Sequence, residues 1–182
     1  MGRRGRLSFS SEQLYFVTTA IVNHARVFTE DRLCDVLVEN IKHYRNRYQF
    51  KIYGYVIMPS HFHWIVEVEP SLGLVSDVMR DIKKYAAWDV MDLLEKENRH
   101  ALLRMFRAEA GALDDQKRKF WMDRFDDEVI RNVGMLRTKL EYIHNNPVQA
   151  GFVVTPEEYK YSSARSYVLG DHSVMEVFTD WQ

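Results

Sequence analysis

Two histidines separated by one residue are the clearest candidate for chemistry in this sequence. His61 and His63 open an apolar run that follows a Pro-Ser break, a pattern typical of the second strand of a β-hairpin. Because side chains alternate along a strand, both imidazoles project from one face, while Phe62 projects from the other and anchors the strand. Two imidazoles in that geometry can chelate one divalent cation. The spacing by itself is equally consistent with two polar side chains on the solvated face of a sheet.

A second group of interest lies on a helix that is predicted to begin after Asn132, a residue type favoured as an N-cap. Pro147 and Gly151 are expected to end this helix, which places Tyr142 in its last turn. Its buried side is an apolar stripe formed by Leu136, Leu140 and Ile143. Tyr142 lies about 100° around the helix from Ile143, at the margin of that stripe, and Asn146, four residues on, shares its face. A tyrosine packed at a helix end without any chemical role is the alternative interpretation.

The elements that would position these groups follow a regular order. They are a strand at 15–22, a helix from Thr29, strands at 52–58 and 61–69, a helix over 74–93, and a strand within 120–130. This order predicts an α+β fold, a ferredoxin-like sandwich with an antiparallel sheet, to which the tyrosine-bearing helix and a C-terminal tail over 152–182 are added. The charged segment 95–119 is predicted to be an insertion, a helical extension followed by a loop.

Length and composition are those of an ordinary globular protein. With 182 residues, 46% of them apolar and 28% charged, we expect one domain over residues 1–182. Cys34 is the only cysteine, which excludes an internal disulfide and favours a reducing, cytoplasmic location. No run of about eighteen apolar residues is present, so we expect no contact with a membrane. The net charge of −1 argues against coating nucleic acid with the whole surface, but it allows a local basic groove.

Local groups of basic residues mark candidate contacts to a nucleic-acid backbone. Residues 1–11 combine arginines with glycines and serines, as expected for a basic arm, and residues 42–51 interleave basic with aromatic side chains. The predicted phosphate contacts are Arg3, Arg4, Arg6, Arg45, Arg47 and Lys84. A solvated arm and a cationic helix C-terminus, which complements the helix dipole, are the alternative interpretations.

Two segments together resemble the single-tyrosine HUH transposases, in particular the REP-associated tyrosine transposases. They are residues 55–63, YVIMPSHFH, and residues 142–153, YIHNNPVQAGFV. The likeness extends to residues 15–19, 120–130 and 159–163, and so covers most of the chain. The resemblance implies that His61 and His63 hold Mg²⁺ or Mn²⁺, that Tyr142 is the nucleophile, and that Asn146 completes the metal site.

The activity that the resemblance implies is metal-dependent cleavage and transfer of single-stranded DNA through a 5′-phosphotyrosine intermediate, in DNA transposition. The implied partner is single-stranded DNA with hairpin-forming palindromes, and a homodimer is one option for the assembly. The chemistry is consistent with this assignment, because a phenol with a pKa near 10 needs a Lewis acid on the phosphodiester oxygens before it attacks at neutral pH. The histidine pair and the tyrosine would therefore depend on each other.

Two other classes of protein remain open at this point. A rolling-circle replication initiator or relaxase pairs the same histidine motif with a tyrosine helix, usually with a lysine nearby, although Asn146 and the Asn-Pro-Val stretch favour a transposase. A non-catalytic nucleic-acid-binding domain on the same fold is the second. The sequence also departs from the family at Gln149, where arginine is usual, and at Lys160-Tyr161, where Pro-Trp is usual. Both departures concern DNA contacts and packing more than chemistry.

Overall fold

The computed structural model describes residues 13–111 and 118–181. Its centre is a four-stranded antiparallel sheet in the order β2-β3-β1-β4. The strands are β1 (Leu14–Ala20), β2 (Lys51–Met58), β3 (His61–Glu67) and β4 (Asp126–Val129). The long crossovers from β1 to β2 and from β3 to β4 carry helices, whereas β2 and β3 form a tight hairpin at Pro59-Ser60. The predicted α+β fold with an antiparallel sheet is therefore confirmed.

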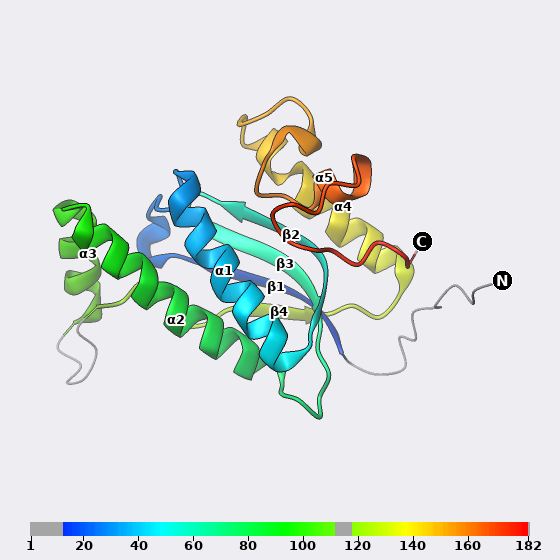
Figure 1. The fold of residues 1–182 in the computed structure, drawn as a ribbon, viewed down its shortest axis with the longest axis horizontal. Coiled ribbons are helices and arrows are strands. Elements are labelled where there is room, and N and C mark those ends of the chain that lie inside the picture. The colour runs from blue at the N-terminus through cyan, green and yellow to red at the C-terminus, as the bar shows by residue number, and fades with distance from the viewer. Residues whose placement is uncertain (1–12, 112–117, 182) are drawn as a thin grey trace.

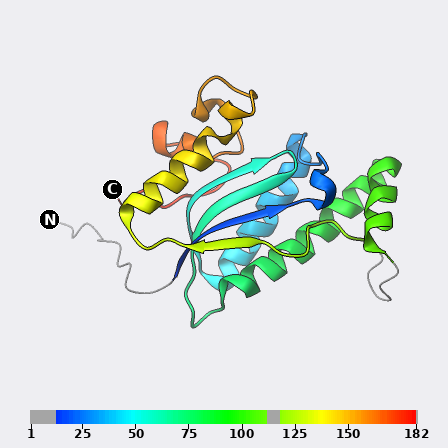
Figure 2. The ribbon, with the colours of Figure 1, turned by 180° about the vertical axis from the view of Figure 1, so that it is seen from behind.

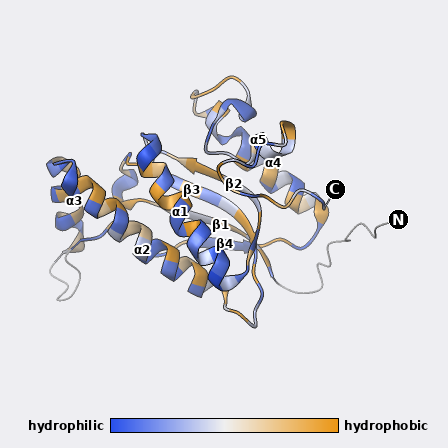
Figure 3. Ribbon diagram, in the orientation of Figure 1, coloured by the Kyte–Doolittle hydropathy of each residue, from blue (hydrophilic) through white to orange (hydrophobic). Residues whose placement is uncertain are grey.

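Helices cover the sheet from both sides (Figures 1 and 2). The longer ones are α1 (Asp31–Tyr48), α2 (Val75–Lys96), α3 (His100–Ala110) and α4 (Val133–Gln149), and the short ones are η1 (Val22–His24), η2 (Pro156–Glu158) and α5 (Ala164–Val168). α1 and α2 lie together on one face, while α4 crosses the other. Apolar and polar residues alternate around α1 and α2, as expected for helices that bury one side (Figure 3). None of the helices in the described parts of the chain is long and apolar enough to span a membrane.

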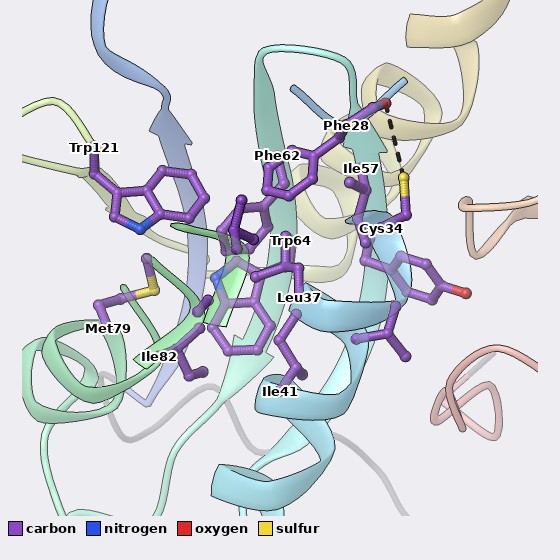
Figure 4. Packing of buried hydrophobic residues seen from close by; sticks show 14 of the residues in the cluster. Phe28, Cys34, Leu37, Ile41, Ile57, Phe62, Trp64, Met79, Ile82 and Trp121 are labelled. Carbon is purple, nitrogen blue, oxygen red and sulfur yellow. Dashed lines mark hydrogen bonds between the residues drawn. The ribbon is translucent and has the colours of Figure 1, made fainter. Parts of the chain in front are cut away.

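The alternation of β3 divides the core into two clusters. Phe62, Trp64 and Val66 pack against α1 and α2, where Trp64 is fully buried (Figure 4). Ile65 belongs to the other cluster, beneath α4. Cys34 lies in the α1 cluster, and burial raises the pKa of its thiol to about 12, so it is a small core residue. The face of β3 that carries the histidines is thus the face that α4 covers.

Two predicted boundaries near the start of the chain are wrong. β1 ends at Ala20, two residues early, because η1 turns the chain there, with Asn23 and His24 at positive φ angles of 55° and 49°. α1 begins at Asp31 with Glu30 as its N-cap, not at Thr29, and no side chain caps this terminus. Leu33 and Cys34 in its first turn are buried in the core, so tertiary packing stabilises this terminus without a side-chain cap.

The segment 95–119 differs from the predicted helical extension. α2 ends at Lys96, a short turn follows in which Asn98 has a φ angle of 56°, and a separate helix α3 begins at His100. Phe106 of α3 is fully buried and its ring lies 5.1 Å from that of Phe120. The apolar side of α3 thus joins the same core cluster as α1 and α2. This burial explains why a segment with weak periodicity still forms a helix.

The C-terminal tail protects the outer edge of β2. The amide of Ile57 donates to the carbonyl of Tyr161 at 2.9 Å, and the amide of Ser163 donates to the carbonyl of Tyr55 at 2.9 Å. Farther along β2, the amide of Phe178 donates to the carbonyl of Ile52 at 2.7 Å. An uncovered edge strand would present these groups to other chains. The tail therefore belongs structurally to the sheet.

Gly54 allows α4 to approach β2, and its replacement provides the first prediction. A Cβ at this position would lie 2.4 Å from Cδ2 of Leu140, so Gly54→Ala should displace the helix and lower the free energy of unfolding by about 1–3 kcal/mol. Urea denaturation of the purified variant measures this loss. The double variant Gly54→Ala/Leu140→Ala should be less destabilised than the sum of the two single variants. Additive losses would contradict the close contact as the cause.

Candidate active site

The two histidines lie side by side at the start of β3, as predicted. His63 stands opposite Thr18 of β1 on one side and Val56 of β2 on the other, and His61 occupies the position two residues nearer the hairpin turn. The centroids of the two imidazole rings are 4.9 Å apart. Because β3 is a central strand held by both neighbours, the relative position of the two rings is fixed by the sheet.

Hydroxyl groups orient both imidazoles through the same ring nitrogen. Oγ1 of Thr18 is hydrogen-bonded to Nδ1 of His63 at 2.7 Å, and Oγ of Ser60 is hydrogen-bonded to Nδ1 of His61 at 3.2 Å. Nε2 of His63 is buried and has no hydrogen-bond partner among the described residues. When Nδ1 donates to the hydroxyl, Nε2 presents its lone pair. This is the arrangement by which proteins usually orient a histidine ligand toward a metal.

The electrostatics keep both rings in the form that binds metals. Burial, with smaller contributions from the neighbouring His61 and Lys139, lowers the pKa of His63 to about 3. Burial, with a smaller contribution from His24, also lowers the pKa of His61. Both imidazoles are therefore neutral near pH 7. No group of three or more His, Cys, Asp or Glu side chains that could hold a metal occurs in residues 13–111 and 118–181.

Tyr142 extends from α4 toward these histidines. Its ring centroid lies 5.2 Å from that of His63 and 5.9 Å from that of Phe16, in edge-on contacts. Phe16 in turn stacks on His63, with centroids 5.7 Å apart and an angle of 14° between the planes. Tyr142 is 45% exposed although it contacts a histidine that is only 4% exposed. The tyrosine therefore lies between the buried imidazole and solvent, within reach of a substrate.

The predicted start of the tyrosine helix is right, and so is Gly151 as an end signal, whereas the predicted break at Pro147 and the position of Tyr142 in the last turn are wrong. The side chain of Asn132 caps α4 by accepting a hydrogen bond from the amide of Met135 at 2.8 Å. The helix continues through Pro147 to Gln149, so Tyr142 lies near its middle and not in its last turn. Proline removes one hydrogen-bond donor, whereas the reversal at Gly151, with a φ angle of 73°, ends the helix. Asn146 is half-buried, one turn beyond Tyr142.

Comparison with known proteins identifies the family. The family described as "Transposase IS200 like" matches residues 10–146, about three quarters of the chain. The chain belongs to this family. It is 24% identical over 165 residues to a Haemophilus influenzae protein assigned as a REP-associated tyrosine transposase, covering 87% of this chain and 83% of that protein. The predicted resemblance is thereby confirmed, and the chain is a transposase that acts in DNA transposition.

Two solved structures share the fold of this transposase. One is a REP-associated tyrosine transposase bound to a REP hairpin, with a TM-score of 0.64 and 22% identity over 99% of this chain and 93% of that one. The other is a structure from Deinococcus radiodurans named as a transposase, with a TM-score of 0.50 and 15% identity over 80% of this chain and 95% of that one. At these identities the similarity supports the fold of the chain.

The structure adds Lys139, which the sequence did not single out, to the surroundings of the tyrosine. Its ammonium lies 4.6 Å from the centroid of the Phe16 ring and pairs with the carboxylate of Glu128 at 2.5 Å. Lys139 precedes Tyr142 by three residues, a spacing that places both on one helix face and that could have indicated it. Since this transposase has a lysine near its tyrosine, that feature does not separate it from replication initiators. The family match separates them.

The predicted phosphate contacts do not gather around the tyrosine. Arg45 and Arg47 belong to α1 and Lys84 to α2, the helix layer on the opposite face of the sheet (Figure 1). Arg45 donates to the carbonyl of Glu176 at 2.9 Å, Arg47 lies 3.7 Å from a carboxylate oxygen of Asp81, and Lys84 lies over aromatic rings of its own helix. These three remain predictions for a separate surface. The others lie outside the described residues: Arg3, Arg4 and Arg6.

Proposed function

We propose that this transposase cleaves single-stranded DNA by attack of Tyr142 on a phosphodiester and then transfers the attached strand, with a divalent cation held by His61, His63 and Asn146. The observation that carries the proposal is the contact between the ring of Tyr142 and that of His63, whose buried Nε2 has no partner among the described residues. A nucleophile and an oriented, neutral imidazole come together there from two distant segments of the chain.

The direction of α4 supports Asn146 as the further ligand. Phe152, just beyond α4, packs on Tyr159, whose hydroxyl donates to the carbonyl of Ile57 at 3.0 Å, near the hairpin turn. α4 therefore runs from the level of His63 toward that of His61. Four helical residues rise about 6 Å, and two strand residues rise about 6.7 Å. This match supports a position for Asn146 near His61 when Tyr142 lies beside His63.

The residues fit Mg²⁺ or Mn²⁺, the cofactors that the family resemblance implies. The amide oxygen of Asn146 is a ligand type that suits both cations, the two neutral imidazoles favour Mn²⁺ over Mg²⁺, and the set leaves coordination positions for substrate oxygens. When bound, the ion would supply a Lewis acid that polarises the phosphodiester and offsets charge on the leaving oxygen. Thr18 and Ser60 would hold the rings of His63 and His61 in position through their Nδ1 atoms.

The reaction has two balanced steps at Tyr142. In the first, the phenolic oxygen forms a bond to phosphorus and releases its proton to solvent, to which the 45% exposed side chain has access. The bond from phosphorus to the 3′ oxygen breaks, that oxygen takes up a proton, and the 5′ phosphate stays on the tyrosine. In the second, the 3′ hydroxyl of another strand loses its proton and attacks the same phosphorus, the bond from phosphorus to the phenolic oxygen breaks, and Tyr142 takes up a proton. Because the phosphotyrosine retains the bond energy, the second strand is joined without ATP.

The proposed substrate is a DNA hairpin with a single-stranded flank, and this preference is the second prediction. A hairpin is bound in one structure with the same fold, and base stacking on aromatic side chains requires unpaired nucleotides. A labelled hairpin with a flank should bind at least about tenfold more tightly than a fully paired duplex of the same sequence. Fluorescence anisotropy at several salt concentrations measures this difference. Equal affinities would exclude the preference.

The decisive test of the proposed chemistry is a covalent DNA–protein species that depends on Tyr142. A non-catalytic DNA-binding domain would give the same hairpin preference but neither metal binding nor this species. Those two measurements therefore separate the proposed function from the binding-only alternative.

A further inference from the structure

Beyond the histidines lies an exposed pair of side chains, Arg26 and Phe152, that has no role in the proposed chemistry. We infer that Arg26 and Phe152 form a binding site for the single-stranded DNA segment next to the reacting phosphodiester. A base stacks on Phe152, and Arg26 contacts a neighbouring phosphate. This inference rests on the proposed function, because it assigns the position of the substrate strand at the same site.

Phe152 is an exposed aromatic ring that the structure holds in place. It follows Gly151 directly at the end of α4, and its amide donates to the carbonyl of Pro147 at 2.9 Å. The ring is 43% exposed, and its centroid lies 6.2 Å from that of Tyr159. Tyr159 is itself fixed to β2 through its hydroxyl, which donates to Ile57. An exposed aromatic ring held in a fixed position offers a face on which an unpaired base can stack.

Arg26 approaches this ring from a different part of the chain. Its guanidinium carbon lies 5.8 Å from the centroid of Phe152. The amides of the next two residues, Val27 and Phe28, both donate to the carbonyl of Pro59 at 2.9 Å. Pro59 belongs to the turn that leads directly into His61, so Arg26 is tied to the strand that carries the histidines. Arg26 is exposed and forms no ion pair with any carboxylate in residues 13–111 and 118–181, which leaves its charge available for a phosphate.

The pair lies on the continuation of the site. α4 carries Tyr142, then Asn146, and ends just before Phe152. β3 and the turn before it carry His63, then His61, and connect to Arg26 through the bonds to Pro59. A strand with its phosphodiester at Tyr142 that extends in the direction of His61 therefore reaches Arg26 and Phe152 next. Stacking on an aromatic ring tolerates any base and requires that the base be unpaired, which favours single-stranded DNA.

Another exposed aromatic and cation pair lies elsewhere and provides a matched control. Trp88 of α2 is 55% exposed, and the ammonium of Lys84 lies 4.8 Å from the centroid of its ring. This pair belongs to the helix layer on the opposite face of the sheet, away from Tyr142. Val154 is a second control, because it is 82% exposed and lies two residues beyond Phe152 without an aromatic ring.

The test measures binding in the absence of chemistry. All variants carry Tyr142→Phe and are titrated, in EDTA, with a labelled hairpin that has a single-stranded flank. Phe152→Leu keeps an apolar side chain in contact with Tyr159 but removes the aromatic ring on which a base would stack. Binding should weaken about tenfold, and its salt dependence should not change. Arg26→Gln should reduce the slope of log K against log salt by about 0.7, the value for one phosphate contact to a single strand. Trp88→Leu and Val154→Ala should bind the hairpin with the same affinity as the Tyr142→Phe parent protein.

An abasic scan of the flank gives the readout that a structural effect would not produce. At one position of the single-stranded flank, removal of the base should weaken binding to the Tyr142→Phe parent protein but should not further weaken binding to Phe152→Leu. The inference is overturned if Phe152→Leu and Arg26→Gln bind like the parent, if Val154→Ala weakens binding equally, or if Trp88→Leu alone weakens it. If Phe152→Leu and Arg26→Gln leave binding unchanged while the wild-type protein still forms the covalent adduct, only the inferred path of the strand is refuted. If both variants weaken binding as expected but the wild-type protein forms no adduct, only the proposed chemistry is refuted.

Discussion

Tyr142→Phe should remove the covalent DNA–protein adduct that the wild-type protein forms with a labelled single-stranded hairpin and Mn²⁺. Phenylalanine retains the ring that contacts His63 and Phe16 and deletes only the hydroxyl, so no phosphorus–oxygen bond to the protein can form. The yield of SDS-resistant species should fall at least about a thousandfold, as expected when a nucleophile is removed. Because Tyr142 is 45% exposed, the free energy of unfolding should change by less than about 0.5 kcal/mol.

Tyr85→Phe is the matched control for this experiment. Tyr85 is also a partly exposed helical tyrosine, 37% exposed, but it belongs to α2 on the opposite face of the sheet. This variant should form the adduct at the wild-type rate. If the adduct persisted in Tyr142→Phe, another tyrosine would be the nucleophile. If the wild-type protein yielded only free cleaved ends, the enzyme would be a hydrolase and the transfer step would be excluded.

Replacing both His61 and His63 by alanine should abolish Mn²⁺ binding, measured by calorimetry, with at least a hundredfold loss of affinity. The two rings, with centroids 4.9 Å apart and with neutral imidazoles, are the proposed ligands that the sheet holds in place. Circular dichroism must show an intact fold for this result to count, because the variant also removes the hydrogen bond between Thr18 and Nδ1 of the buried His63. Equal affinity in the double variant would place the metal site elsewhere.

Two further variants should distinguish a proposed metal ligand, Asn146, from a residue that only orients a ligand, Thr18. Asn146→Ala should weaken Mn²⁺ binding and slow the reaction without abolishing either, because two ligands remain. Thr18→Val removes the hydroxyl that orients His63 through Nδ1, and should cost about 10–100-fold in affinity. Thr19→Val is its matched control, since Thr19 is buried on the same strand and its Oγ1 has no partner in the described residues. An effect of Thr19→Val as large as that of Thr18→Val would point to general destabilisation.

The sequence by itself determined those features that depend on local periodicity. A period of two placed His61 and His63 on the same face of β3, and the structure confirms it. The order of strands and helices predicted the antiparallel sheet, because hairpins and crossovers allow few arrangements of such an order. The cap at Asn132 followed from a local hydrogen bond, and the structure confirms that too. The family resemblance rested on short motifs that can be read without any tertiary contact.

Only the tertiary structure decided how these parts meet. The strand register brings Thr18 to His63, and the packing of α4 over β2 and β3, at a distance that Gly54 permits, brings Tyr142 to the same imidazole. α3 forms because Phe106 is buried against a distant segment. In each case the deciding interaction joins residues far apart in the chain, and local periodicity carries no information about such pairs.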